Sequence, residues 1–183
     1  MILNRLLRNW GNMMKKIVNS EEMKKIIDLL AKEVKVKIGL ENLVIIGIKR
    51  RGAILAERIK NKLKKDIPLG SLDITLYRDD FSKVGANPIV SETDILFDID
   101  EKNILLVDDV LYTGRTIRAA LDALIDFGRP SLIKLLVLID RGDREFPIMA
   151  DFVGKTIKIK KNQMVEVKVK ELDGKDEVII IDR

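Results

Sequence analysis

Short apolar runs alternate with helical stripes along most of this chain. Residues 43–48, 104–107 and 132–139 are nearly continuous in Ile, Leu and Val, the pattern of strands buried on both faces of a sheet. Residues 72–77 are predicted to form a further strand. Three intervening stretches carry apolar residues at helical spacing: 23–34, 54–63 and 117–124. Strands that alternate with helices predict a parallel sheet with helices on both faces, and so an α/β fold.

The two ends of the chain differ from this pattern. Three short alternating stretches near the C-terminus suggest a small antiparallel or edge element: 156–159, 164–169 and 178–181. We assign residues 1–19 to an N-terminal extension, either an amphipathic segment or a stretch before a natural start at Met13 or Met14, and residues 20–183 to one domain. No run has the length of a membrane span and no signal peptide is apparent, so we expect a cytoplasmic protein.

The composition excludes several kinds of chemistry. Of the 183 residues, 46% are hydrophobic and 34% are charged, and neither cysteine nor histidine occurs. Disulfides, thiolate metal sites and Ser-His triads are therefore excluded, and so is the commonest general base. The net charge of +5 fits an anionic ligand or nucleic acid, although a solvated lysine-rich surface would give the same value.

The most informative segment is a strand, a turn and a helix within residues 104–124. Asp108 and Asp109 lie where the strand should end, and residues 113–116 (Thr-Gly-Arg-Thr) turn into the helix. Gly114 gives the turn its backbone freedom, and amide groups at a helix N-terminus bind anions. Carboxylates are good acceptors from sugar hydroxyls, so this segment predicts a sugar-phosphate site.

Other charged residues follow the neighbouring strands. Residues 49–52 (Lys-Arg-Arg-Gly) and 140–141 (Asp-Arg) come directly after apolar runs. Ligands of parallel sheets bind at the carboxyl ends of the strands, and arginine forks suit phosphate groups. The alternatives are an ordinary crossover with an N-capping threonine, and a solvated run of three cations.

The sequence of residues 107–116, Val-Asp-Asp-Val-Leu-Tyr-Thr-Gly-Arg-Thr, resembles the phosphoribosyl pyrophosphate (PRPP) motif of type I phosphoribosyltransferases. Within them it is similar to the pyrimidine operon attenuation regulators that are also uracil phosphoribosyltransferases. The resemblance spans roughly residues 20–183. It implies the type I phosphoribosyltransferase fold, a central parallel sheet flanked by helices, with a small hood and a flexible loop.

This resemblance implies roles for particular residues. The 5′-phosphate and ribose of PRPP are assigned to two acids and the turn: Asp108, Asp109, Thr113, Gly114, Arg115 and Thr116. The pyrophosphate is assigned to a loop that often contains a cis peptide bond, and to one residue of a mobile loop: Lys49, Arg50, Arg51, Gly52 and Arg78. Asp108, Asp109 and Arg78 are the expected catalytic residues.

At the nucleobase, the resemblance implies contacts from Arg141 and from the backbone near Val165. Asp173 is expected near a Mg²⁺ ion that is held mainly through PRPP. The implied reaction transfers ribose 5-phosphate from PRPP to uracil, giving UMP and pyrophosphate. Purine-type relatives often have an acid where Tyr112 stands, and a purine-type transferase is the alternative.

The same regulators bind the leader mRNA of pyrimidine genes on a basic surface of a homodimer, in response to UMP and UTP. The candidate cations here are Arg144, Lys155 and Lys158. Four residues depart from the family pattern: Asp143, Met149, Asp28 and Lys32 stand where histidine, arginine, threonine and histidine are expected. Losing a cation and gaining an acid weaken phosphate binding, so a transferase that has lost RNA binding is a further alternative.

Overall fold

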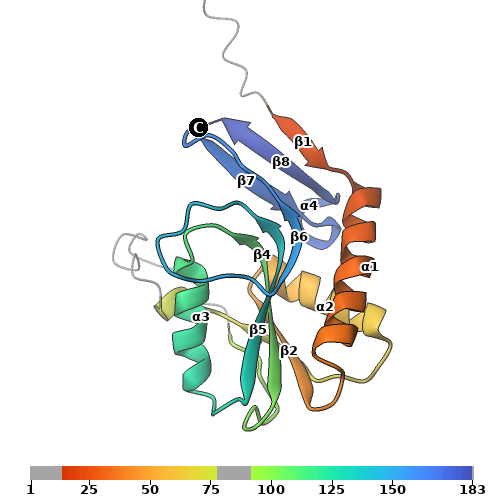
Figure 1. The fold of residues 1–183 in the computed structure, drawn as a ribbon, viewed down its shortest axis with the longest axis vertical. Coiled ribbons are helices and arrows are strands. Elements are labelled where there is room, and N and C mark those ends of the chain that lie inside the picture. The colour runs from red at the N-terminus through yellow and green to blue at the C-terminus, as the bar shows by residue number, and fades with distance from the viewer. Residues whose placement is uncertain (1–13, 78–91, 183) are drawn as a thin grey trace, which may run out of the picture.

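The computed structural model describes residues 14–77 and 92–182, which form an α/β core beneath a smaller antiparallel sheet (Figure 1). The main sheet has five parallel strands in the order β3-β2-β4-β5-β6: β2 (Leu43–Ile48), β3 (Leu69–Leu72), β4 (Asn103–Leu111), β5 (Leu132–Asp140) and β6 (Phe152–Thr156). Its helices are α1 (Ser20–Lys37), α2 (Arg51–Leu63) and α3 (Arg115–Ile125). The expected α/β class, with helices flanking a central parallel sheet, is confirmed.

Helices cover both faces of the main sheet, with α1 and α2 on one face and α3 on the other (Figure 1). Successive side chains of a strand point to opposite faces, so a continuous apolar run buries both. In β4, Leu105 and Val107 pack toward α1 and α2, whereas Ile104 and Leu106 pack toward α3. Because helices cover both faces, the carboxyl ends of the strands are the part of the sheet where polar side chains can lie close together.

The second sheet, which we call the hood, is antiparallel and has the order β1-β8-β7. Its elements are β1 (Lys15–Val18), β7 (Gln163–Lys168), the short helix α4 (Lys170–Asp173) and β8 (Glu177–Asp182). Hood residues such as Val167 and Val178 belong to the same apolar core as α1 and α2. The hood is therefore fixed to the domain by packing.

The described end of the expected N-terminal extension is part of the hood. β1 pairs with β8, with Lys15 opposite Ile180, so residues 15–18 join the last strand of the chain. Asn19 then caps α1, because its side chain accepts from the Glu22 amide at 3.0 Å and the Glu22 carboxylate accepts from the Asn19 amide at 2.8 Å. The cap is therefore Asn19 and not Ser20.

The strand predicted at residues 72–77 is wrong. The strand is β3, Leu69–Leu72, and residues 75–77 form a 3₁₀ turn, η2. The Asp73 carboxylate accepts from the Thr75 amide at 2.7 Å, and this local hydrogen bond competes with continued strand pairing. Gly70 suits the strand despite its low propensity, since a Cβ there would lie 2.9 Å from the carbonyl oxygen of Asp94.

Two further strands have different bounds from those predicted. Residues 152–156 pair with β5 as β6, in place of the predicted 156–159. β4 continues past Val107 through both acids to Leu111, which pairs with Asp140. The strands predicted near 164–169 and 178–181 are confirmed as β7 and β8. In the described ranges, no helix is long and apolar enough to cross a membrane.

Candidate active site

Two adjacent carboxylates lie in the last part of β4. Asp108 is 6% exposed and Asp109 is half-buried. One oxygen of Asp108 accepts from the Asp109 amide at 2.9 Å, and one oxygen of Asp109 accepts from the Val110 amide at the same distance. These hydrogen bonds hold both side chains against their own strand and leave the remaining oxygens for a ligand.

Burial makes the negative charge of this pair unfavourable. It raises the pKa of Asp108 well above the usual value, and the neighbouring charge of Asp109 raises that pKa further. Burial also raises the pKa of Asp109, while the hydrogen bond with Asp108 and the positive charge of Arg51 act in the opposite direction. The two acids form a coupled pair whose charge needs a cationic partner.

The loop after β2 supplies cations opposite these acids. The Lys49–Arg50 peptide bond is cis, as in the pyrophosphate loop that the family resemblance implies. α2 then begins at Arg51. A Cβ on Gly52 would lie 2.5 Å from the carbonyl oxygen of Val107, so glycine is required because α2 packs closely on β4. The close backbone approach at Gly52 is thus made to the neighbouring strand β4.

A cavity of about 270 Å³ lies between the loop and the acids. It is lined by residues from three of the predicted segments: Lys49, Arg50, Arg51, Asp108, Asp109 and Thr116. Asp73 and Thr75 also line this cavity. They were not predicted as site residues because residues 72–77 were expected to form a strand. The Asp-x-Thr spacing of residues 73–75 was the signal that could have revealed this turn.

The turn into α3 has the geometry expected of an anion site. Gly114 has a φ of +91° and precedes the first residue of the helix. The first amides of a helix have no partner within it, which makes them available to a phosphate. The Arg115 side chain is engaged elsewhere, since its Nε donates to Glu145 at 2.6 Å. Its guanidinium also lies over Phe146, and its backbone amide donates a long hydrogen bond to the Thr113 hydroxyl at 3.4 Å.

A buried arginine lies next to this turn. Arg141 is 5% exposed, and its guanidinium lies 3.6 Å from the centroid of the Tyr112 ring. Its Nε atom is buried and has no hydrogen-bond partner within residues 14–77 and 92–182. Val165, in β7, is half-buried and packs on the core beneath the hood. The structure therefore places Arg141 beside β4 and Val165 in the hood.

The three RNA candidates have different surroundings. Arg144 is internal: it pairs with Asp140 at 2.6 Å and donates to the carbonyl oxygens of Tyr112 at 2.7 Å and Ile148 at 3.0 Å. Lys155 donates to a carbonyl oxygen of β1 at 2.9 Å, whereas Lys158 is exposed. The departures Asp143 and Met149 are also exposed. Arg144 thus contributes to the fold of its own loop.

Arg78 lies outside the described residues, but both ends of its segment are held. The Tyr77 hydroxyl donates to Asp126, and Arg118 donates to the Tyr77 carbonyl oxygen at 3.2 Å. At the other end, the Lys49 ammonium group donates to the carbonyl oxygen of Glu92. The described residues on either side of that segment therefore lie beside α3 and the Lys49–Arg51 loop.

Asp173 lies against the pyrophosphate loop. Its carboxylate accepts from Arg51 at 3.0 Å and from the Val169 amide at 2.8 Å, and these bonds lower its pKa, the Val169 amide most. The described part of the chain contains no group of three acidic side chains that could hold a metal ion.

A cationic loop, two acids and the turn into α3 thus meet at one edge of the parallel sheet, an arrangement that suits a phosphorylated sugar. Residues 13–172 match the phosphoribosyl transferase domain family. The chain belongs to this family.

Its sequence relatives point to one branch of the family. The bifunctional protein PyrR of Deinococcus radiodurans is 52% identical over 171 residues, covering 91% of this chain and 93% of the relative. That of Elusimicrobium minutum is 49% identical, covering 92% and 97%. A hypoxanthine-guanine phosphoribosyltransferase structure from Bacillus anthracis has a TM-score of 0.69 at 20% identity, covering 93% of this chain and 99% of that one. At that identity the likeness shows the fold alone.

Proposed function

We propose that this protein transfers ribose 5-phosphate from PRPP to N1 of uracil, releasing UMP and pyrophosphate. The observation that carries the proposal is the cavity in which the Lys49–Arg51 loop faces Asp108 and Asp109, with Thr116 of the phosphate turn beside them. The choice of a pyrimidine follows the PyrR relatives at about half identity, whereas the purine enzymes are alike only in fold.

The site residues divide the substrate between them. The turn of residues 113–116 holds the 5′-phosphate with backbone amides, and Asp108 and Asp109 accept hydrogen bonds from the ribose hydroxyls. The Lys49–Arg51 loop, with Arg78, binds the pyrophosphate. As the bond from C1 to the pyrophosphate oxygen breaks, positive charge develops on the ribose, and the two carboxylates stabilise it.

The leaving group departs with the electron pair of the broken bond, and the lone pair of uracil N1 forms the new bond to C1 as N1 releases its proton to solvent. Phosphoribosyltransferases generally use Mg²⁺ with PRPP. A Mg²⁺ ion bound through substrate oxygens would neutralise the pyrophosphate, and Asp173 is the nearest acid to Arg51 that could assist. Arg141 and the backbone at Val165 are proposed to contact the base.

A panel of bases tests the reaction. Purified protein with Mg²⁺ and PRPP should convert uracil to UMP, and should leave hypoxanthine, guanine and adenine unchanged. Asp109→Asn in the same panel should remove the activity. Conversion of a purine at a rate equal to or above that of uracil would contradict the pyrimidine assignment.

We also propose that the protein binds the leader mRNA of pyrimidine genes and that UMP or UTP increases the affinity. A groove between α1 and α2 supports this, because it is lined by Lys32, Lys35, Lys62 and Lys64. Asp28 lies in the same groove and pairs with Lys62 at 2.6 Å, so the acid is already neutralised. Asp28 should therefore repel RNA phosphates less strongly than the sequence suggested.

RNA titrations at several salt concentrations test this second activity. Each phosphate contact contributes a slope of about −0.7 in log K against log salt for single strands. Lys32→Glu with Lys35→Glu should flatten the slope, and so should Lys158→Glu with Lys160→Glu if contacts extend to the loop after β6. Lys102→Glu, at the amino end of β4, is the control. Binding that none of these reversals changes would contradict the proposed surface, and sedimentation of the protein tests the expected homodimer.

A further inference from the structure

Two arginines on one face of α2 hold the hood loop between β7 and β8. Arg51 and Arg58 are seven residues apart, two helical turns, so they point the same way. Arg51 contacts Asp173, and Arg58 contacts Glu171 and Asp176. All three acids belong to the eight residues 169–176, which include α4.

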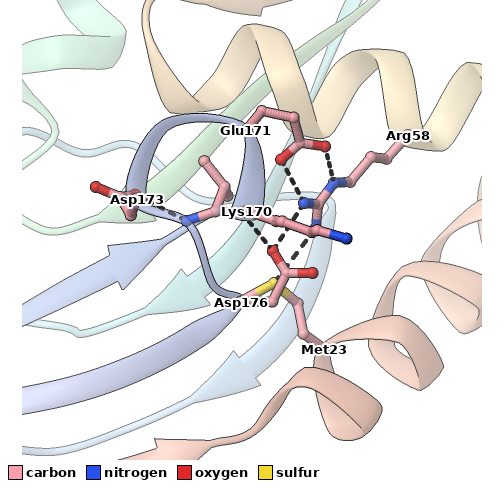
Figure 2. Close-up of polar contacts among 7 residues, drawn as sticks. Met23, Arg58, Lys170, Glu171, Asp173 and Asp176 are labelled. Carbon is pink, nitrogen blue, oxygen red and sulfur yellow. Dashed lines mark hydrogen bonds and ion pairs between the residues drawn. The ribbon is translucent and has the colours of Figure 1, made fainter.

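Arg58 is the more extensively bound of the two. Its Nε and Nη2 atoms donate to the two oxygens of Glu171 at 3.1 and 2.6 Å, and Nη2 also donates to Asp176 at 2.7 Å. Figure 2 shows the guanidinium between these two acids, with the sulfur of Met23 from α1 beside Asp176. Bidentate arginine–carboxylate pairs fix both distance and orientation.

The hood loop is also closed within itself. Asp176 accepts from the Lys170 amide at 2.8 Å, and Asp173 accepts from the Val169 amide at 2.8 Å. Asp173 therefore cannot shift without the whole loop, and the position of the loop relative to α2 is set by Arg58.

Asp173 in turn orients Arg51. It takes one nitrogen of the guanidinium, while the Nε of Arg51 is buried and has no hydrogen-bond partner in the described ranges. Arg51 lines the cavity beside Asp109. One nitrogen of the Arg51 guanidinium is thus held by Asp173 of the hood loop, and its buried Nε is available to donate to a ligand oxygen.

We propose that Arg58 is a positioning residue for pyrophosphate binding. Together with Glu171 it fixes the hood loop, the loop fixes Asp173, and Asp173 holds Arg51 in the orientation that receives the pyrophosphate of PRPP. This inference rests on the proposed function, since it assigns the pyrophosphate to Arg51. Loss of the Arg58–Glu171 pair leaves the Arg51 side chain free to reorient. Binding of pyrophosphate must then also order this side chain, which weakens the affinity.

The test uses Glu171→Gln, because Glu171 is 49% exposed at its side chain and its replacement leaves the core intact. The matched control is Glu33→Gln, which removes a side chain that is 50% exposed from an ion pair on α1. Glu171→Gln should weaken PRPP and pyrophosphate about three- to tenfold, toward the lower end of the coupling between residues of one network, with kcat and the KM for uracil unchanged. Arg58→Lys should lie between this variant and the wild type.

The pathway through Asp173 is tested by a double-mutant cycle. Asp173→Asn alone should weaken pyrophosphate, and adding Glu171→Gln to it should have almost no further effect. Additive effects, or a Glu171→Gln variant that binds pyrophosphate like Glu33→Gln, would overturn the proposal. Calorimetric titration with magnesium pyrophosphate needs no nucleobase, so it decides this inference even where turnover with uracil fails.

Discussion

The acids of β4 and the acids of the hood loop have opposite electrostatic situations. Burial raises the pKa of Asp108 well above its usual value, and no cation of the described residues forms an ion pair with it. In the hood loop, the hydrogen bond from Arg58 lowers the pKa of Glu171, and the Val169 amide and Arg51 lower that of Asp173. Ionisation of Asp108 therefore opposes folding, whereas ionisation of the hood-loop acids supports it.

This difference in electrostatics indicates where the ligand binds. The hood-loop acids are paired with arginines, whereas Asp108 has no ion-pair partner among the described residues and Asp109 is influenced only by the charge of Arg51. A ribose that becomes cationic in the transition state supplies positive charge to these two β4 acids. Destabilised groups of this kind are expected at active sites, where stability and activity oppose each other.

The largest effect should follow from removing a charge of the β4 pair. Asp109→Asn keeps the shape of the side chain and should lower kcat about 10²–10³-fold, the usual effect of losing one group that stabilises transition-state charge. The protein should remain folded. Steady-state rates with PRPP and uracil measure the effect, and near wild-type rates would remove the basis for the comparison.

A smaller but clear effect should follow at Arg51, which lies between the two groups of acids. Arg51→Gln removes a cation near Asp109 and the partner of Asp173. A hydrogen bond to a charged group contributes about 1.5–3 kcal/mol, so PRPP affinity should fall about 10- to 100-fold. Lys62→Gln, on the outer part of α2, is the control. Equal affinities in the two variants would show that Arg51 serves the hood alone.

The smallest effect should come from the hood acids. Because the folded-state pKa of Glu171 is lowered, its contribution to stability is complete above the unfolded value of about 4.3 and is lost as the pH falls through the folded value. Glu171→Gln should lower the free energy of unfolding at pH 7 by no more than about 1 kcal/mol, as is usual for exposed ion pairs. Urea unfolding at pH 7 and pH 4 measures this. A difference that grows toward pH 4 would contradict the assignment.

The apolar pattern was enough to predict the layered core, since the continuous runs of β2, β4 and β5 are buried on both faces whatever their neighbours. It failed where one polar contact decides the local path. Asp73 ends a strand that alternation would continue, and Gly70 lies within a strand that propensity would interrupt. β1 was missed because its partner, Ile180, is far along the chain.

The site was predicted in the same uneven way. The β4 acids, the phosphate turn and the cationic loop lie in contiguous motifs at strand ends, so position alone brought them together. The Arg58–Glu171 pair joins residues 113 positions apart, and it depends on how the hood packs on α2. No local pattern carries that information.

The most direct test of whether the β4 acids serve a ligand at a cost to stability compares the free energy of unfolding of Asp108→Asn with that of the wild-type protein. Each protein is measured with and without magnesium-PRPP. The raised pKa of Asp108 means that ionisation destabilises the folded protein at pH 7, and that this cost disappears as the pH falls toward the unfolded value of about 3.9. Asparagine can still accept from the Asp109 amide. We therefore predict that the empty variant is more stable than wild type at pH 7, that the difference shrinks toward pH 4, and that PRPP stabilises the variant less. If the variant without ligand is less stable than the wild type, or if PRPP stabilises both proteins equally, the β4 acids are structural and do not form the PRPP site.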